Sequence, residues 1–263
     1  MRAPVFIGGL KKSGTSLLRK LIGRHPDVFG GLETHWFTPE MVEHWRDSSS
    51  DRQVWLRKFY EVSETEFAEI KEASDSAFDW FTRFMDFCAV RSGKNRWVEK
   101  TPDNIIHLDL IRAHWPDAQV LHVVRDYRDI YASWVRNDVG SLGTFLAKVR
   151  LNLDLIDGLA GTRSRVYLEV SFESLVNEPR ETLMKVFEFL GESWDEGLAE
   201  YEGDGTDYQR VFEVTGKKST TAVSLARPIF NSSVGSWKDV LSQADSQAIE
   251  KEFSKYFQLW HWA

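Results

Sequence analysis

A glycine-containing loop near the start of the chain has the composition of an anion-binding turn. Residues 9–16 read Gly-Leu-Lys-Lys-Ser-Gly-Thr-Ser and directly follow a short apolar run at 5–7. The helix expected at about 15–24 would present unpaired N–H groups and the positive end of its dipole to this loop. Glycine permits close approach of an anion, and lysine and hydroxyl side chains add hydrogen-bond donors. We expect phosphate binding by these residues: Lys11, Lys12, Ser13, Gly14, Thr15 and Ser16.

The spacing of Gly9 and Gly14 resembles that of the Walker A motif, GxxxxGK[ST], with one important departure. A Walker A loop needs lysine directly after the second glycine, where it reaches the β and γ phosphates. Here that residue is Thr15, and Lys12 lies two residues before Gly14. The loop therefore suits one phosphate carrying a transferable group better than a magnesium triphosphate. Taken alone, it could also be an ordinary strand-to-helix turn with surface lysines.

A second candidate phosphate site follows the clearest strand of the sequence, at 119–124. Arg125 stands at the carboxyl end of this strand, where ligands bind in open α/β sheets. Ser133 lies about two turns along the helix expected at 126–136, so both side chains could converge on one phosphate. By itself, Arg-Asp-x-Arg-Asp at a helix start is more often explained by capping and surface pairing.

The elements that must position these residues alternate along the chain. Apolar runs at 5–7, 96–98, 119–124 and 165–170 predict short strands, and helical periodicity is clearest at 179–190. This alternation predicts an α/β fold, with a central parallel β-sheet flanked by helices on both faces.

Two stretches are harder to assign. Residues 39–92 look helical and irregular, and residues 202–236 are rich in Gly, Ser and Thr and could form a long functional loop. Because no linker, repeat or low-complexity tract divides the chain, we expect one domain over residues 1–263.

Composition and charge exclude several classes of protein. The formal charge is −7, from 33 Lys and Arg against 40 Asp and Glu, which argues against sequence-independent nucleic-acid binding. The single cysteine, Cys88, excludes an internal disulfide framework, and its apolar neighbours indicate a core position. The histidines are scattered, so we expect no metal site. Apolar runs are too short for a signal peptide or a membrane span, and we expect a soluble cytoplasmic protein.

Four segments, in the expected order, resemble those of sulfotransferases that use 3′-phosphoadenosine 5′-phosphosulfate as donor. Residues 12–16 (KSGTS) are similar to the family's 5′-phosphosulfate loop, and residues 123–133 (VVRDYRDIYAS) to its 3′-phosphate segment. Residues 172–179 resemble a strand-to-helix segment, and residues 233–238 a C-terminal Gly-x-Trp-Lys element. The resemblance extends over about residues 4–242 and implies a P-loop-like sulfotransferase domain.

The resemblance also implies the residues of the reacting centre. Residues 25–34 (HPDVFGGLET) are similar to a segment of the branch that includes tyrosylprotein sulfotransferases, and Glu33 falls on its catalytic glutamate. Lys100 matches a lysine that faces the sulfuryl group, and His35 lies close enough to Glu33 to compete as the base. The matches to the 3′-phosphate segment and the C-terminal loop imply further donor-binding residues: Arg125, Ser133, Thr221, Arg227 and Phe230.

Three charged residues have the types that sulfuryl transfer requires. The reaction is an in-line displacement that, by analogy with phosphoryl transfer, depends on positioning and charge stabilisation. Lys12 would neutralise the oxygen bridging sulfur and the departing phosphate, Lys100 would meet the sulfuryl oxygens, and Glu33 would remove the acceptor's proton. Glu33 could instead cap a helix and Lys100 could be a surface lysine. Lys11 adjoins Lys12, and the sequence does not separate their roles.

Differences from the tyrosylprotein branch leave the acceptor open. Phe172 replaces a tyrosine that contacts the cofactor, Asn137 replaces an arginine, and the paired cysteines of that branch are missing. Specificity for protein tyrosine is therefore not implied. We expect a hydroxyl-bearing small molecule, sugar or peptide, with a helical insertion at about 39–92 on the acceptor side.

Two other functions compete with a sulfotransferase. A P-loop kinase for a small molecule would need the absent Walker A lysine and a magnesium-binding carboxylate. A non-catalytic binder of adenosine bisphosphate would keep Lys12, Arg125 and Ser133 but would need neither Glu33 nor Lys100.

Overall fold

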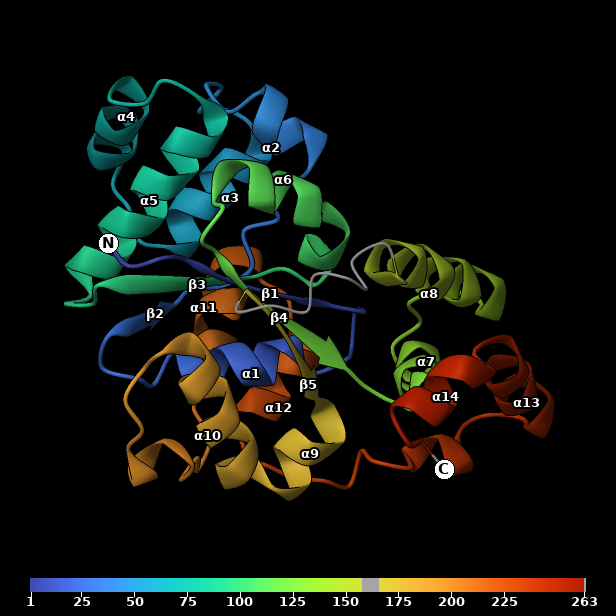
Figure 1. Ribbon diagram of the computed structural model, residues 1–263. Coiled ribbons are helices and arrows are strands. Elements are labelled where there is room, and N and C mark those ends of the chain that lie inside the picture. Colours follow the sequence, from blue (N-terminus) through green and yellow to red (C-terminus); the bar gives the residue numbers. More distant parts are fainter. Residues whose placement is uncertain (158–165, 263) are drawn as a thin grey trace.

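Five short strands form the centre of the protein, and all four pairings between them are parallel. The computed structural model describes residues 1–157 and 166–262, and its strand order is β2-β3-β1-β4-β5 (Figure 1). The strands are β1 (Val5–Gly9), β2 (Val28–Gly30), β3 (Arg96–Lys100), β4 (Gln119–Val124) and β5 (Tyr167–Ser171). The parallel α/β fold predicted from the sequence is confirmed.

Alternate residues of β1 pack into opposite faces of the sheet. Phe6 contacts the aromatic cluster on one face, where its ring lies edge-on to Trp97 at 5.4 Å between centroids. Val5 and Ile7 pack on the other face against Leu18 of the first helix. Burial on both faces explains why the strand reads as a continuous apolar run.

The helices between β2 and β4 cover the first face of the sheet (Figure 1). They are α2 (Pro39–Glu43), α3 (Asp51–Phe59), α4 (Glu64–Glu72), α5 (Ala77–Arg91), the 3-10 helix η1 (Pro102–His107) and α6 (Leu108–His114). Trp36 stacks on Trp80 and Phe81, each at 4.9 Å between ring centroids, and joins these helices to the segment that follows β2. Residues 39–92 are therefore more regular than the sequence indicated.

The opposite face and the β4 side of the molecule carry the remaining helices. The first group packs on Val5 and Ile7 and comprises α1 (Thr15–Ile22), α9 (Phe172–Asn177), α10 (Pro179–Leu190) and η2 (Glu196–Leu198). The second group forms its own apolar cluster and comprises α7 (Tyr127–Arg136), α8 (Leu142–Asp157), α13 (Gln243–Glu252) and α14 (Ser254–Leu259). Gly191 ends α10 with a left-handed φ of 67°, as its position after the periodic run predicted.

The expectation of a long loop at 202–236 is wrong. This stretch contains α11 (Thr206–Thr215) and α12 (Thr220–Leu225), and η3 (Ser236–Asp239) begins at its end. The Ser219 hydroxyl caps α12 by accepting from the Ala222 N–H. Both helices are short, and contacts with other segments stabilise them. For example, Val211 and Val214 of α11 pack against the aromatic core.

Several element boundaries also differ from those expected. β3 continues to Lys100 instead of ending at Val98, and β2 forms a strand that the sequence did not indicate. The expected start of the last strand, Arg165, lies outside the described residues. Cys88 is buried, which raises the pKa of its thiol to about 12 and confirms its core position. No helix in the described ranges is long and apolar enough to cross a membrane.

Candidate active site

The carboxyl ends of β1, β4 and β5 meet at a cavity of about 560 Å³. Arg125 follows β4 directly and Phe172 follows β5, as expected for a ligand site in an open parallel sheet. Eleven residues expected from the sequence line it: Lys11, Lys12, Gly14, Thr15, Ser16, Glu33, Arg125, Ser133, Thr221, Arg227 and Phe230. Ser13 and Lys100 were also expected there but do not form part of its wall.

The loop between β1 and α1 has the backbone of a close-approach turn. Gly14 has φ of 105°, and a Cβ there would lie 2.3 Å from Phe172 Cδ2, so only glycine fits. Lys12 has φ of 80°, an uncommon conformation for a residue with a side chain. The Ser13 side chain is buried and finds no hydrogen-bond partner within the described ranges, and its N–H donates to the Leu10 carbonyl at 2.9 Å. Ser13 therefore supports the turn rather than facing the cavity.

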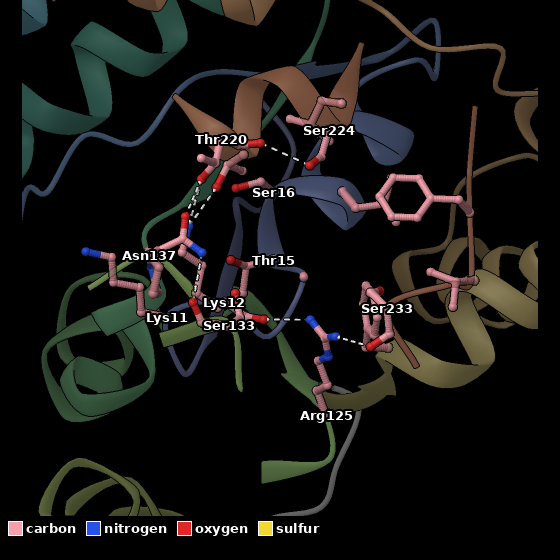
Figure 2. Close-up of a pocket in the computed structure, with 18 of the residues that line it drawn as sticks. Lys11, Lys12, Thr15, Ser16, Arg125, Ser133, Asn137, Thr220, Ser224 and Ser233 are labelled. Carbon is pink, nitrogen blue, oxygen red and sulfur yellow. Dashed lines mark hydrogen bonds between the residues drawn. The ribbon is translucent and has the colours of Figure 1, made fainter. Parts of the chain in front are cut away.

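Arg125 is held by three contacts with other segments. Its Nη1 donates to the Lys12 carbonyl at 3.1 Å, and its Nη2 donates to the Ser233 carbonyl at 2.8 Å (Figure 2). The guanidinium lies 4.2 Å from the ring centroid of Phe172. Arg125 Nε is buried and has no hydrogen-bond partner among the described residues. A fixed, charged side chain with a spare donor at a cavity wall is suited to binding an anion.

Lys12 reaches across the cavity to α12. Its Nζ lies 3.3 Å from Thr220 Oγ1 and 3.5 Å from Thr221 Oγ1, and Thr220 in turn donates to Asn137 Oδ1 at 2.9 Å. Figure 2 shows Thr220 and Ser224 of α12 on the side of the cavity away from Arg125. Burial and the adjacent Lys11 lower the pKa of Lys12. The lysine thus joins the loop to the C-terminal helices.

Glu33 contacts two basic side chains at the edge of the same cavity. One carboxylate oxygen, Oε1, forms an ion pair with Lys100 Nζ, and the other, Oε2, lies 3.1 Å from His35 Nε2. Lys100 also donates to Ser16 Oγ at 2.8 Å, so it connects Glu33 to the start of α1. Burial alone would raise the pKa of Glu33, but Lys100 and the His35 hydrogen bond hold that pKa well below its usual range.

A buried carboxylate on β3 fixes the backbone beside Glu33. Glu99 accepts hydrogen bonds from the Thr34 N–H at 3.1 Å, the Thr34 hydroxyl at 2.9 Å and the Thr101 hydroxyl at 2.8 Å. Thr101 Oγ1 accepts in turn from the His35 N–H at 3.1 Å, and His35 has a left-handed φ of 51°. Sequence reasoning missed Glu99, although its position next to Lys100 was a signal.

Helix capping and ion pairing explain two residues of the Arg-Asp-x-Arg-Asp segment, Asp126 and Arg128. Asp126 caps α7 by accepting from the Arg128 N–H at 2.8 Å, and it also pairs with the Arg128 guanidinium. Arg128 extends to Glu250 on α13 at 2.5 Å. These residues stabilise the helix start, whereas Arg125 faces the cavity. His35, the competing base, also lines the wall, and three wall residues were not singled out from the sequence: Asp103, Arg136 and Thr220.

One group of metal-ligating residue types lies away from the cavity, at His25, Asp27 and Glu192. The Glu192 carboxylate already pairs with Arg96 at 2.8 Å and with Arg2 at 2.5 Å. His25 Nδ1 accepts a hydrogen bond from the Asp27 N–H at 3.1 Å. The His25 and Glu192 side chains are therefore engaged in contacts that stabilise the fold.

Comparison with known proteins identifies the family. The sulfotransferase family profile matches residues 4–196, which is most of the chain. This chain belongs to the sulfotransferase family. It is 27% identical to protein-tyrosine sulfotransferase 1 of Danio rerio over 208 residues, which cover 75% of this chain and 56% of that protein. It is 26% identical to the nodulation protein NoeE of Sinorhizobium fredii over 269 residues, covering 93% of this chain and 62% of that protein.

The sulfotransferase spans only part of the length of such relatives. It covers 40% of the protein-tyrosine sulfotransferase of Drosophila melanogaster, with 26% identity over 211 residues. Its fold is similar to that of the sulfotransferase domain of the Synechococcus PCC 7002 olefin synthase, with a TM-score of 0.69 and 21% identity. That match covers 95% of this chain and 94% of the other.

Proposed function

We propose that this sulfotransferase moves a sulfuryl group from 3′-phosphoadenosine 5′-phosphosulfate to an acceptor hydroxyl. One observation carries the proposal: a single cavity joins a cationic end to a carboxylate–histidine pair, Glu33 and His35. The cationic end is lined by Lys11, Lys12, Arg125, Arg136 and Arg227. These charges suit a donor with several negative charges, and Arg125 Nε, to which the described part of the chain supplies no partner, is a hydrogen-bond donor for a phosphate.

The two phosphate-bearing ends of the donor would bind different segments. The loop of residues 11–16 and the start of α1 would hold the 5′-phosphosulfate through backbone N–H groups, hydroxyls and Lys12. Arg125 and Ser133 would hold the 3′-phosphate. Thr221, Arg227 and Phe230 would surround the rest of the nucleotide. The bound donor supplies an electrophilic sulfur whose leaving group is a phosphate, so no metal is required.

Glu33 is the proposed base for the acceptor hydroxyl. Its low pKa keeps it ionised, so it can accept a hydrogen bond from the hydroxyl. Because a low pKa also makes it a weak base, the proton would move to Glu33 only as the acceptor oxygen bonds to sulfur and becomes acidic. Lys12 would neutralise charge on the bridging oxygen of the leaving phosphate. Lys100 does not line the cavity but contacts Ser16 and Glu33, which do, and from there its positive charge would stabilise the sulfuryl oxygens. His35 contacts Glu33 and lines the same wall, so it is the competing base.

The acceptor is proposed to be a small molecule, sugar or peptide that carries a hydroxyl. It would approach from the side of the 39–92 helices, because the His35 ring lies 6.3 Å from the Trp55 ring of α3. A direct test is to incubate the protein with the sulfate donor and a panel of phenols, sugars, lipidic alcohols and peptides. Mass spectrometry should detect an acceptor that has gained SO₃. Transfer from ATP with magnesium, and none from the sulfate donor, would contradict the proposal.

The donor assignment makes a prediction about Arg125. Arg125→Ala should weaken binding of adenosine 3′,5′-bisphosphate by about 10-fold or more, because a charged hydrogen bond to the 3′-phosphate is lost. Binding of AMP, which lacks that phosphate, should change much less. Isothermal titration calorimetry with both ligands measures the difference, and equal losses would contradict the assignment.

A further inference from the structure

A buried carboxylate of α7 holds the C-terminal segment that reaches the cavity. Asp129 is 1% exposed. Its Oδ2 accepts the Gly235 N–H at 2.7 Å, its Oδ1 accepts the Trp237 N–H at 2.9 Å, and Ser236 Oγ lies 3.3 Å from Oδ1. Both carboxylate oxygens therefore bind one three-residue segment at the start of η3, which is 106 residues or more away in sequence.

The same segment contacts Arg125 at its other end. The Ser233 carbonyl accepts from Arg125 Nη2 at 2.8 Å, and Ser236 Oγ lies 3.1 Å from that carbonyl. Arg136, also on α7, donates to Ser236 Oγ at 3.1 Å. The Ser233 carbonyl is one of the two carbonyls that orient the guanidinium, the other being that of Lys12. Displacement of this segment would remove one of the two constraints on Arg125.

We infer that Asp129 is a positioning residue for the donor's 3′-phosphate, which acts through residues 233–237 on Arg125. The inference rests on the proposed function, because it requires Arg125 to bind that phosphate. Asp129 itself does not line the cavity, so it does not touch the donor directly. The buried carboxylate accepts two backbone hydrogen bonds, which offset the loss of its hydration. These bonds hold residues 233–237 in a fixed position against α7.

Asp129→Asn is the variant that tests this role. The amide keeps the size of the side chain, but its NH₂ group would face a backbone N–H donor of Gly235 or Trp237 and push the segment away. The dissociation constant for adenosine 3′,5′-bisphosphate should rise about 10-fold, as for the loss of one charged hydrogen bond, while that for AMP rises less than about threefold. Calorimetric titration with both ligands measures this split, and KM for the sulfate donor should rise more than kcat falls.

Matched variants separate positioning from general damage. Asp239→Asn removes the same charge from an exposed residue of η3 and should change neither constant. Ser236→Ala is the second test variant if Asp129→Asn does not fold. Its affinity for adenosine 3′,5′-bisphosphate should fall by about threefold, without a comparable fall in its affinity for AMP. If the folded variants lose affinity equally for both ligands, or lose none for either, the inference is overturned.

Arg125→Ala is the reference that keeps the two proposals distinguishable. A selective loss in Arg125→Ala without one in Asp129→Asn or Ser236→Ala refutes only the role of Asp129. No selective loss in Arg125→Ala refutes the assignment of the 3′-phosphate site itself, and the role of Asp129 with it.

Discussion

The Glu33 carboxylate divides its two oxygens between different partners. Lys100 binds one oxygen and also contacts Ser16 at the start of α1, while His35 binds the other. Lys100 is 2% exposed, and its contacts connect the proposed base to the proposed donor loop. Lys100, which the family resemblance implies near the sulfuryl group, therefore also pairs with Glu33 and lowers the pKa of that carboxyl.

Substitution of Glu33 tests its role as base. Glu33→Gln keeps the size and part of the hydrogen bonding but cannot accept a proton as a carboxylate does. We expect normal donor affinity and a loss of about 10²-fold or more in the transfer step, measured by single-turnover kinetics. Because Lys100 and His35 hold the pKa of Glu33 low, the rate should show no acid limb down to about pH 5.

The His35→Ala variant provides the comparison. Full activity in Glu33→Gln together with an inactive His35→Ala would assign the base to His35. Activity in both variants would mean that proton removal does not limit the rate, as expected for an acidic hydroxyl such as a phenol.

The two adjacent loop lysines make separate predictions. Lys12 extends toward Thr220 and Thr221 across the cavity, whereas the Lys11 side chain is exposed. Lys12→Ala should lower turnover by about 10²- to 10³-fold with little change in melting temperature, because the group stabilises charge rather than the fold. Lys11→Ala is the matched control and should lose far less. The reverse order of effects would assign the bridging oxygen to Lys11.

At the scale of elements, α12 lines the cavity, and α11 beside it is held by contacts with residues far away in sequence. A buried ion-pair network attaches α11 to α1: Arg19 pairs with Asp207, and Lys20 lies 3.1 Å from Asp207 and 2.7 Å from Asp204. Five residues after α11 ends, α12 places Thr220 and Thr221 against Lys12. The helix α1, which begins at the donor loop, therefore also holds α11, which packs against the cavity-lining helix α12.

Breaking this network should destabilise the protein. Asp207→Asn leaves the buried Arg19 and Lys20 with less compensating charge and should cost about 3 kcal/mol of unfolding free energy. Glu213→Gln on the same helix removes an exposed carboxylate that pairs with Arg210 and should have little effect. Urea denaturation measures both variants. Equally small changes would show that the network does not anchor α11.

At the scale of the whole molecule, one histidine lies inside the central sheet. His122 of β4 is 4% exposed, and its Nδ1 lies 2.8 Å from the Tyr167 hydroxyl of β5. Burial lowers the pKa of His122 to about 3. The unfolded chain therefore binds a proton here at a higher pH than the folded chain does, and stability must fall as the pH falls.

This difference in proton binding predicts acid sensitivity of the fold. Between about pH 6 and pH 4, His122 should remove about 1.4 kcal/mol of stability for each unit of pH. His122→Asn should flatten this dependence, while substitution of the exposed His44 by Asn should leave it unchanged. Denaturation midpoints across this pH range provide the measurement. If the stability of His122→Asn fell with pH as steeply as that of the unsubstituted protein, His122 would not be the source of the acid sensitivity.

Local patterns predicted the strand–loop–helix units because their causes are local. The apolar run before Gly9 and the helix after Gly14 mark the donor loop, and Arg125 directly follows a strand whose carboxyl end must face a ligand site. The α11 and α12 helices were missed because they are short and are stabilised by contacts with other segments. The extension of β3 to Lys100 was missed because its register with β1 pairs Lys100 with Ile7 across the sheet.

What the sequence alone determined is the fold class, the family resemblance and eleven of the residues that line one cavity, because each follows from residue types and their spacing along the chain. Only the tertiary structure decided which of them touch. Lys100 meets Glu33 across 67 residues of sequence, and Lys12 meets Thr220 across 208. Ser13 turns inward, Glu99 fixes Thr34, and Asp129 holds residues 235–237. Such contacts depend on how distant segments pack, and the periodicity of a single segment carries no record of its partner.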